Sequence, residues 1–459
     1  ISVIGADSSN TIIDGDSSGT VVTFINGEDA TALLRNFTVT NGTGSLFDSD
    51  IMGGGILIGT STSPSIDNVF ITGNSATHGG GVYVFHNSSP MLSNLNVTNN
   101  LAETGAGIKF LVSNGTLTNS IISSNTGIGI DGHSANVLIN NSTISNNGGG
   151  LSFDDGSFFT LDSVTISNNT ASGSGGAIYS INSSFTLDNS TIQYNVSNAV
   201  GSSEEWEVGG GGIYTYESYF IITNTTIRNN SSAHNGGGVY FQGNSDQSII
   251  DDCLIFNNSA SSSGGGFFGS NSQIKFLKSI VDNNSASSGG GFYLNYCNSE
   301  FLHLRIYENE ATGSGGGIQF DHGSGVFTNV TIADNSAPEG GAILGHYNGT
   351  NGNETLEFNN SIVWGNTTDE VTMEYQDTDP QIDLTYNYNL SSVELPGTGN
   401  IVGDPLLGSG YDPLEGSPAI DVGNPNAFYN DGDGTRNDMG YTGGNGIVLS
   451  ATDIDFGYV

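Results

Sequence analysis

The few basic residues of this sequence include one group whose chemistry could act on an acidic sugar. Lys278 and His303 occupy equivalent positions one repeat apart, Lys275 precedes them, and Arg305 lies two residues after His303. A polysaccharide lyase needs a base to remove the proton beside a uronate and cations to neutralise the carboxylate. Lys278, His303 and Arg305 are therefore the catalytic candidates. Ordinary ion pairing is the alternative, because carboxylates lie nearby in the sequence: Asp282, Glu300, Glu308 and Glu310.

Paired carboxylates offer a second chemistry, the hydrolysis of a glycosidic bond. Asp154 and Asp155 form one such pair, and Asp251 and Asp252 form another. Hydrolases use one carboxyl group as an acid and the other as a base or nucleophile. Asp252, however, takes a position that recurs in every repeat, and the sequence around His133 lies upstream of both pairs, where a companion catalytic motif is not expected. We therefore favour a structural role for these pairs.

One acidic loop near the C-terminal end has the character of a calcium site. The loop contains Asp431, Asp433 and Asp438, together with Gly432 and Gly434. The glycines allow the backbone to turn sharply, so the carboxylates can converge. Oxygen ligands of this kind suit Ca²⁺, although the spacing is not that of an EF-hand. A turn that closes the fold explains the same residues, so the sequence requires no cofactor and admits Ca²⁺.

Five aromatic residues stand at the second position after successive glycine clusters. They are Tyr179, Tyr214, Tyr240, Phe268 and Tyr293. If each cluster begins a strand, these rings face outward from neighbouring strands about 4.8 Å apart and form a strip. Such a strip could stack on a glycan or dock a partner. The alternative is a self-stacking ladder that stiffens the sheet.

The longest repeat carries an insertion around one of the two tryptophans. Trp206 is surrounded by three carboxylates, those of Glu204, Glu205 and Glu207. Loops that project from repeat proteins commonly carry binding function, so this insertion is the preferred contact point with a partner. A solvated acidic loop is the alternative.

The elements that position these residues follow from an internal repeat. A cluster of glycines followed by an apolar residue recurs eleven times, and between clusters a strand-like run ends in Asn. Neighbouring marker asparagines are mostly 22 to 28 residues apart, with two longer intervals of 35 and 31. The clusters begin at Gly53, Gly79, Gly105, Gly148, Gly175, Gly210, Gly236, Gly264, Gly289, Gly315 and Gly340. The marker asparagines are Asn74, Asn100, Asn125, Asn147, Asn169, Asn195, Asn230, Asn258, Asn284, Asn309, Asn335 and Asn366.

Each repeat contains three short apolar runs. The third residue before every marker Asn is Ile or Val, and its neighbours are mostly polar, which is the period-two pattern of a strand with one inward face. With no helical periodicity, this pattern predicts an all-β fold, a right-handed parallel β-helix with three strands per coil of about 22–28 residues. An irregular capping segment is expected at the C-terminal end.

The recurring small and polar residues are expected to serve this scaffold. Stacked asparagine amides can hydrogen-bond their equivalents one coil away and tolerate left-handed backbone angles, and glycine supplies the positive φ of a tight corner. Cys253 takes an inward position and should be a small core residue. Because Cys297 stands elsewhere in its coil, we expect no disulfide between the two.

The repeats resemble those of polymorphic outer-membrane proteins and pectin-lyase-like surface proteins. Residues 172–179 (SGSGGAIY) and 285–293 (SASSGGGFY) carry the resemblance, which extends over about residues 1–445. It implies a right-handed β-helix from a bacterial surface protein, and it is specific for fold and weak for activity. We predict a parallel β-helix over 1–366, its C-terminal part and cap over 367–445, and a linker with the start of an immunoglobulin-like module over 446–459.

Composition limits the partners of this chain. Its 459 residues carry a formal net charge of −39 with only seven Lys and Arg, so nucleic acid is excluded and polyanions are repelled. The sequence contains no apolar stretch of about 20 residues, which is the length needed to span a membrane. We expect a secreted, cell-surface protein that is non-catalytic and acts in adhesion or as part of a surface or filament assembly, with glycan or protein partners or self-association. The alternative is a carbohydrate-active enzyme, a lyase or hydrolase, or a glycan-binding module.

Overall fold

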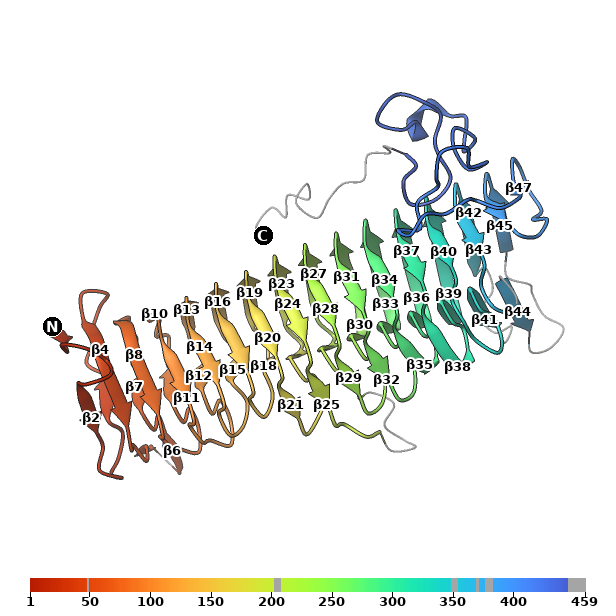
Figure 1. Ribbon diagram of the computed structural model, residues 1–459. Helices are drawn as coiled ribbons and strands as arrows, with labels where there is room; N and C mark the ends of the chain where they lie inside the picture. The colour runs from red at the N-terminus through yellow and green to blue at the C-terminus, as the bar shows by residue number, and fades with distance from the viewer. Residues whose placement is uncertain (48, 202–207, 348–353, 369–370, 376–382, 445–459) are drawn as a thin grey trace. The chain divides into compact units, whose positions relative to one another are not determined.

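The chain folds into short parallel strands that follow one another around successive coils (Figure 1). The computed structural model describes residues 1–47, 49–201, 208–347, 354–368, 371–375 and 383–444. These residues form two compact units: unit 1 includes the described residues up to Phe220, and unit 2 those from Ile221 onward. The division falls within one strand, β27 (Tyr219–Thr223).

In unit 1, each coil contains a first strand after the glycine cluster, a second strand, and a third strand that ends near the marker Asn. The first strands are β3 (Val22–Phe24), β7 (Ile56–Ile58), β9 (Val82–Phe85), β12 (Ile108–Leu111), β15 (Ile130–His133), β18 (Leu151–Asp154), β22 (Ile178–Ile181) and β26 (Ile213–Tyr216). The second strands are β1 (Ser2–Ile4), β10 (Met91–Ser93), β13 (Asn114–Thr118), β16 (Asn136–Asn140), β19 (Phe158–Asp162) and β23 (Ser184–Asp188). The third strands are β2 (Ile12–Asp14), β11 (Asn96–Thr98), β14 (Ile121–Ser123), β17 (Thr143–Ser145), β20 (Thr165–Ser167) and β24 (Thr191–Gln193), while β4 (Leu33–Thr40) and β8 (Ser65–Thr72) span the second and third positions.

Unit 2 repeats this order with longer strands. First and second positions merge in β30 (Val239–Asp251), β33 (Phe267–Leu277), β36 (Phe292–Leu302) and β39 (Ile318–Thr328), and separate again in β41 (Ile343–Tyr347), β44 (Val371–Tyr375), β42 (Thr355–Asn359) and β45 (Asp383–Asn387). The third strands are β28 (Thr226–Arg228), β31 (Leu254–Phe256), β34 (Ile280–Asp282), β37 (Arg305–Tyr307), β40 (Thr331–Ala333), β43 (Ile362–Trp364), β46 (Leu390–Ser391) and β47 (Ile401–Val402).

The predicted architecture of three strands per coil is confirmed, with two additions. Several coils carry a short fourth strand between the marker Asn and the glycine cluster, and an antiparallel hairpin projects from unit 1. The fourth strands are β21 (Thr170–Ala171), β25 (Val196–Ser197), β29 (Ser231–Ser232), β32 (Ser259–Ala260), β35 (Ser285–Ser288) and β38 (Glu310–Ser314); the hairpin is β5 (Ser45–Phe47) with β6 (Asp50–Met52).

Aromatic columns fill the core of both units. In unit 1, Phe159 stacks on Phe185 with ring centroids 4.9 Å apart. In unit 2, Phe301 stacks on Phe327 at 4.5 Å, and Phe327 stacks on Phe358 at 4.6 Å. All five rings are buried, because inward positions one coil apart place equivalent side chains directly above one another. The limited number of apolar residues is therefore enough to form a thin but continuous core within each unit.

The marker asparagines form buried hydrogen-bonded ladders, as the sequence predicts. In unit 2, Nδ2 of Asn284 donates to Oδ1 of Asn309 at 3.0 Å, and Nδ2 of Asn309 donates to Oδ1 of Asn335 at 2.9 Å. The expected left-handed backbone belongs to a different residue. It falls on the residue before the ladder asparagine, such as Asn283 with φ of 52°. We call this position the corner position.

Glycine is required at the cluster for two distinct reasons. Gly236 has φ of 61°, which residues with a Cβ rarely adopt. Its neighbour Gly237 has no room for a side chain, since a Cβ there would lie 2.4 Å from the carbonyl oxygen of Gly265 one coil away. The cluster therefore allows a tight corner and close contact between coils.

Both cysteines are free and buried, which confirms the expectation of no disulfide. Burial raises the pKa of the Cys253 thiol to about 12 and also raises that of Cys297. Both residues therefore act as small core side chains and not as reactive thiols.

The irregular segment that follows β47 packs against the outer side of several coils of unit 2. This C-terminal segment, residues 403–444, contains one short 3-10 helix, η1 (Ala427–Tyr429). Its Ala419 and Met439 form a buried cluster with Ile362 of β43 and Leu390 of β46. The segment predicted as a cap thus packs against the side of the coils of unit 2 (Figure 1). Among the described residues, no helix has the length and apolar character needed to span a membrane.

Candidate functional site

Arg305, a predicted catalytic cation, fastens the C-terminal segment to the solenoid. Its Nη2 donates to Oδ1 of Asp412 at 2.5 Å, and its guanidinium lies 3.9 Å from the centre of the Tyr441 ring. Only 16% of its side chain is exposed. The ion pair and the cation–π contact leave little of the guanidinium for a substrate.

The other two candidates, Lys278 and His303, stand on adjacent coils as predicted. Nδ1 of His303 lies 3.4 Å from the carbonyl oxygen of Tyr441, to which it can only donate. Burial, together with the nearby charge of Lys278, lowers the pKa of the imidazole. The structure therefore brings the three candidates to one region, but two of them, Arg305 and His303, contact the C-terminal segment.

The predicted ion pairing is correct for one residue and wrong for another. Lys275 pairs with Glu300 at 3.0 Å, as expected of neighbouring charges. The partner of Arg305 is Asp412, which lies 107 residues away in the sequence, and not one of the carboxylates on nearby coils. An ion-pair partner on the irregular segment could not be predicted from the repeat pattern.

The carboxylate pair in unit 1 is also engaged in local pairing. Nδ1 of His133 lies 2.6 Å from Oδ1 of Asp154, and its Nε2 lies 3.2 Å from Oδ2 of Asp155. Ser134 also donates to Asp155 at 2.8 Å. This geometry agrees with the structural role expected from the sequence.

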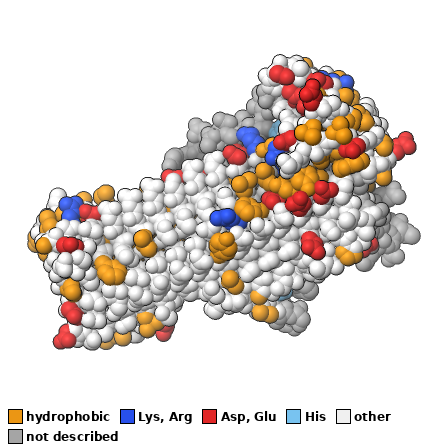
Figure 2. Space-filling view, in the orientation of Figure 1, with side chains coloured by type: hydrophobic (Ala, Val, Ile, Leu, Met, Phe, Trp, Pro, Cys, Tyr) orange, Lys and Arg blue, Asp and Glu red, His pale blue; other side chains and the backbone are white. Residues whose placement is uncertain are grey.

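An open groove of about 650 Å³ lies between the C-terminal segment and the third strands of unit 2. The solenoid contributes Glu308, Asp334 and Trp364 to its lining. The segment contributes Asp404, residues 406–409, Tyr411 and Leu414, so none of the lining residues is basic. Figure 2 shows hydrophobic side chains gathered where the segment meets the solenoid, with acidic side chains beside them. The groove combines apolar walls, two aromatic rings and three carboxylates.

The two groove carboxylates of the solenoid stand at a backbone position that asparagine fills in several other coils. Glu308 and Asp334 occupy the corner position of adjacent coils, each with φ of 52°. Asparagine fills this position in other coils of unit 2, as at Asn257 and Asn283, because Asn tolerates the left-handed conformation. Acidic residues at the corner position of two adjacent coils place both carboxylates along one edge of the solenoid.

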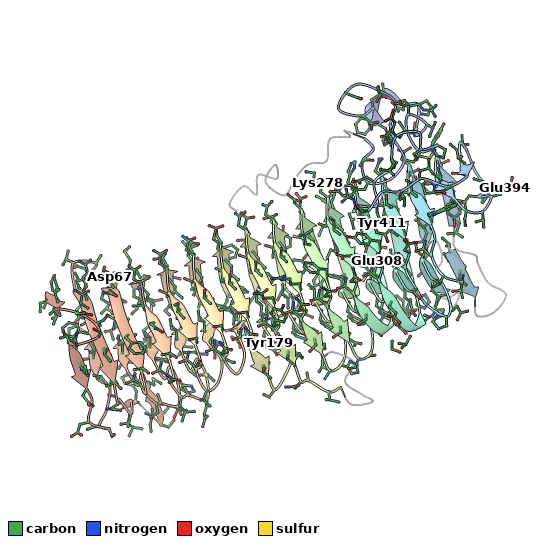
Figure 3. All side chains as sticks on the ribbon, viewed as in Figure 1. Asp67, Tyr179, Lys278, Glu308, Glu394 and Tyr411 are labelled. Atoms are coloured by element: carbon green, nitrogen blue, oxygen red, sulfur yellow. The ribbon has the colours of Figure 1, made fainter. Side chains whose placement is uncertain are left out.

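Tyr411 of the C-terminal segment connects the two carboxylates. Its Oη lies 3.0 Å from Oε1 of Glu308 and 2.8 Å from Oδ2 of Asp334, so the single hydroxyl proton is shared between the two acceptors. Figure 3 labels Tyr411 and Glu308. The ring of Tyr411 stacks on Tyr307 with centroids 4.3 Å apart. Burial and the two carboxylates raise the pKa of the phenol, which therefore stays neutral. Sequence reasoning treated Glu308 only as a pairing partner and did not single out Asp334, Trp364 or Tyr411.

The predicted aromatic strip forms stacks within each unit. In unit 1, Tyr179 stacks on Tyr214 at 5.2 Å. In unit 2, Phe268 stacks on Tyr240 at 4.8 Å and on Tyr293 at 5.3 Å. The rings of Tyr214, Tyr240 and Phe268 are buried, at 4%, 1% and 7% exposed. This geometry suits the self-stacking alternative, while partner binding by the strip stays a prediction that rests on the more exposed Tyr179 and Tyr293.

The predicted contact loop with Glu204, Glu205, Trp206 and Glu207 lies outside the described residues. Its binding role therefore stays a prediction.

The acidic loop near the C-terminal end groups differently from the sequence prediction. Carboxylate oxygens of Asp421, Asp431 and Asp438 lie within 4.8 Å of one another. Asp433 points elsewhere and accepts hydrogen bonds from the backbone and hydroxyl of Thr435 at 2.9 and 2.6 Å. Burial and the neighbouring carboxylates raise the pKa of both Asp431 and Asp438. Oxygen ligands at this separation fit Ca²⁺ chemically, and Ca²⁺ binding stays a prediction with Asp421 in place of Asp433.

We expect the variant Asp438→Asn to raise the thermal stability of the calcium-free protein at neutral pH. The folded-state pKa of Asp438 is raised, so its contribution to stability is full below the unfolded value near 3.8 and is lost as pH rises through the folded value. Asparagine is neutral at every pH, and its side-chain oxygen can still accept the hydrogen bond from the backbone amide of Asp421. Ca²⁺ should raise the melting temperature of the native chain and not that of the variant. Equal responses to Ca²⁺ would contradict the site, with Asp433→Asn as the matched control.

Comparison with known proteins agrees with this fold. A family described as "right handed beta helix region" matches residues 5–163 and 158–337, which confirms the handedness expected from the sequence. No curated protein matches the chain in sequence. Similar solved structures include the Vag8–C1 inhibitor complex, at 9% identity and TM-score 0.41, covering 84% of this chain and 98% of that chain. Another is pectate lyase Pel9A, at 11% identity and TM-score 0.24, covering 94% and 86%.

Proposed function

The chain belongs to the right-handed β-helix family, and from this premise we propose that it is a non-catalytic extracellular protein that acts in adhesion. The solenoid supplies a rigid scaffold, and the groove beside the C-terminal segment supplies the contact surface. The net charge of −39 suits an exported protein that must stay soluble and resist unspecific association. Partners are expected to be glycans or proteins of a cell surface, and not nucleic acid.

The observation that carries this proposal is that the basic residues a lyase would need contact the C-terminal segment instead. A lyase would need Arg305 and His303 beside a uronate, yet both residues contact Tyr441 of the C-terminal segment. The open surface next to them is instead lined by aromatic rings and carboxylates. Such a surface can hold a ligand by stacking and hydrogen bonding, but it repels the acidic sugar that a lyase would cleave.

A hydrolase is the second candidate, because the groove holds carboxylates on adjacent coils. Glu308 and Asp334 both accept from the Tyr411 hydroxyl, so their carboxyl groups approach one another closely. Glycosidases use such pairs as acid and nucleophile. In this groove the hydroxyl of Tyr411 occupies the space between the two groups, which favours a binding role.

The test combines a binding assay with a product assay on the purified full chain. We expect retention on glycan arrays or on intact cell surfaces, with no release of reducing ends or unsaturated products. Product formation that disappears in Glu308→Gln would establish the hydrolase, and product formation that disappears in Lys278→Met would establish the lyase. Either result would overturn the proposed function.

A further inference from the structure

One face of unit 1 carries no charged residue over six consecutive coils. The third-strand positions of β8, β11, β14, β17, β20 and β24 pair in register, so their outward side chains form straight rows. Each of these strands lies between two exposed residues with positive φ, such as Asn141 and Asn146 on either side of β17. Each coil thus contributes six residues, and none of them is Asp, Glu, Lys, Arg or His. We call this set the neutral face, and it comprises residues 68–73, 94–99, 119–124, 141–146, 163–168 and 189–194.

The other outward faces of the same coils are charged. First strands carry Lys109 on β12, Asp131 on β15 and Asp154 on β18. Second strands carry Asp162 on β19 and Asp188 on β23. Figure 2 shows few charged side chains over the middle of unit 1 on the side that faces the viewer. Charge is therefore absent from one face, and not from unit 1 as a whole.

The neutral face is open to solvent and has the composition of an interface centre. Among its hydroxyls and amides, Ile121 and Tyr194 are 47% and 49% exposed. Carboxylates lie just outside the face along one edge, as at Asp67, whose Oδ1 accepts from Nδ2 of Asn94 at 2.6 Å. Protein interfaces are depleted of charge at their centre, have apolar or aromatic anchors there, and are surrounded by a polar rim. The neutral face has all three properties.

A second copy of this chain suits the neutral face better than another partner. Each copy carries a net charge of −39, so two copies repel one another except where their surfaces lack charge. The rows of the face repeat at about 4.8 Å, and a partner with the same repeat can interdigitate with them along their whole length. Addition of a peptide strand to the backbone is excluded, because β11, β14, β17 and β20 are each paired on both sides.

We propose that two copies of this chain associate through their neutral faces about a two-fold axis. This arrangement uses the same surface on both copies, so identical rows meet with identical spacing. The face is about 24 Å long and about 20 Å wide, so the contact buries about 1,000 Å² in total, near the lower limit of a specific interface. The association is therefore weak in dilute solution and becomes effective where copies are concentrated, as on a cell surface. This inference goes beyond the proposed adhesive function, because the groove of unit 2 takes no part in it.

The experiment is sedimentation velocity of the purified full chain from about 10 μM to about 1 mM. We expect a reversible equilibrium between monomer and dimer. Association should strengthen as salt rises from about 50 mM to about 500 mM, because salt screens the repulsion between two anionic copies and the interface has no ion pairs to lose. A chain that stays monomeric at the highest concentration, or a dimer that dissociates as salt rises, would overturn the inference.

A matched pair of variants locates the interface. Thr143→Asp places a carboxylate near the middle of the neutral face and should weaken association at least about tenfold, because like charges then meet across the contact. Thr116→Asp is the control, since Thr116 is an equally half-buried threonine on the second strand of the preceding coil, β13. It should change association by less than about twofold. Equal weakening would show that net charge alone governs association, which contradicts the interface.

Cross-linking provides a readout that does not depend on added charge. Thr143→Cys should be joined to its equivalent in a second copy by a short bismaleimide, whereas Thr116→Cys should not. The native Cys253 and Cys297 are buried and should not react. Cross-linking of Thr116→Cys alone would place the contact on another face and overturn the inference. A chain that stays monomeric and binds a neutral glycan, with binding lost in Thr143→Asp, would assign the face to a glycan instead of a second copy.

Discussion

Replacing Asn309 by alanine is expected to lower the free energy of unfolding of unit 2 by about 3–5 kcal/mol. The side chain is fully buried, and its Nδ2 donates to Asn335 and to the carbonyl oxygens of Val281 and Tyr307. Its Oδ1 accepts from both nitrogens of Asn284. Alanine would leave several of these buried groups without partners, at about 1–3 kcal/mol for each. Denaturant unfolding with hydrogen exchange on neighbouring coils measures the loss.

The control for this prediction is the next residue in the chain. Glu310 is exposed, and Glu310→Ala should change stability by no more than about 0.5 kcal/mol. If Asn309→Ala were as mild, the asparagine ladder would not be a main source of stability. Protection lost only in the coils beside Asn309 would show that the ladder acts between nearest neighbours.

Replacing Arg305 by methionine should release the C-terminal segment while the coils stay folded. Methionine keeps the apolar stem but removes the bond to Asp412 and the contact with the Tyr441 ring. We expect a loss of about 2 kcal/mol, because Asp412 keeps 40% of its side chain exposed and can be solvated. Limited proteolysis within residues 403–444 and Trp364 fluorescence report the release. Glycan binding at the groove should weaken in parallel.

Lys275→Met provides the matched control for Arg305→Met. The pair of Lys275 and Glu300 has similar geometry at 3.0 Å but is more exposed, so its loss should cost no more than about 1 kcal/mol. It should leave proteolysis of the C-terminal segment unchanged. Equal cleavage in the two variants would contradict the role of Arg305 in holding the segment.

Much of the fold could be predicted because each coil repeats the same physical solution. An inward Ile or Val, a ladder asparagine and a glycine corner recur at fixed spacing, so the position of a residue within its coil follows from counting. The same counting placed Lys278 and His303 on adjacent coils correctly. It assigned the left-handed angles to the ladder asparagine, whereas they fall on the corner position, because the ladder amide must point inward to reach its neighbour.

The groove could not be predicted because half of it comes from a segment outside the repeat. Tyr411 meets Glu308 and Asp334 across 103 and 77 residues of sequence, and no periodicity relates them. The acidic cluster shows the same limit, since Asp421 joins Asp431 and Asp438 through the fold of an irregular loop. One signal was present: carboxylates replace asparagine at two consecutive corner positions, where few residue types are tolerated.

The most direct test of this account is a combined binding and product assay of the purified full chain on glycan arrays and intact cell surfaces. We predict retention that weakens in Trp364→Ala, which removes an aromatic wall of the groove, with no release of reducing ends or unsaturated products. Retention unchanged in Trp364→Ala, or product formation that disappears in Glu308→Gln, would contradict the account.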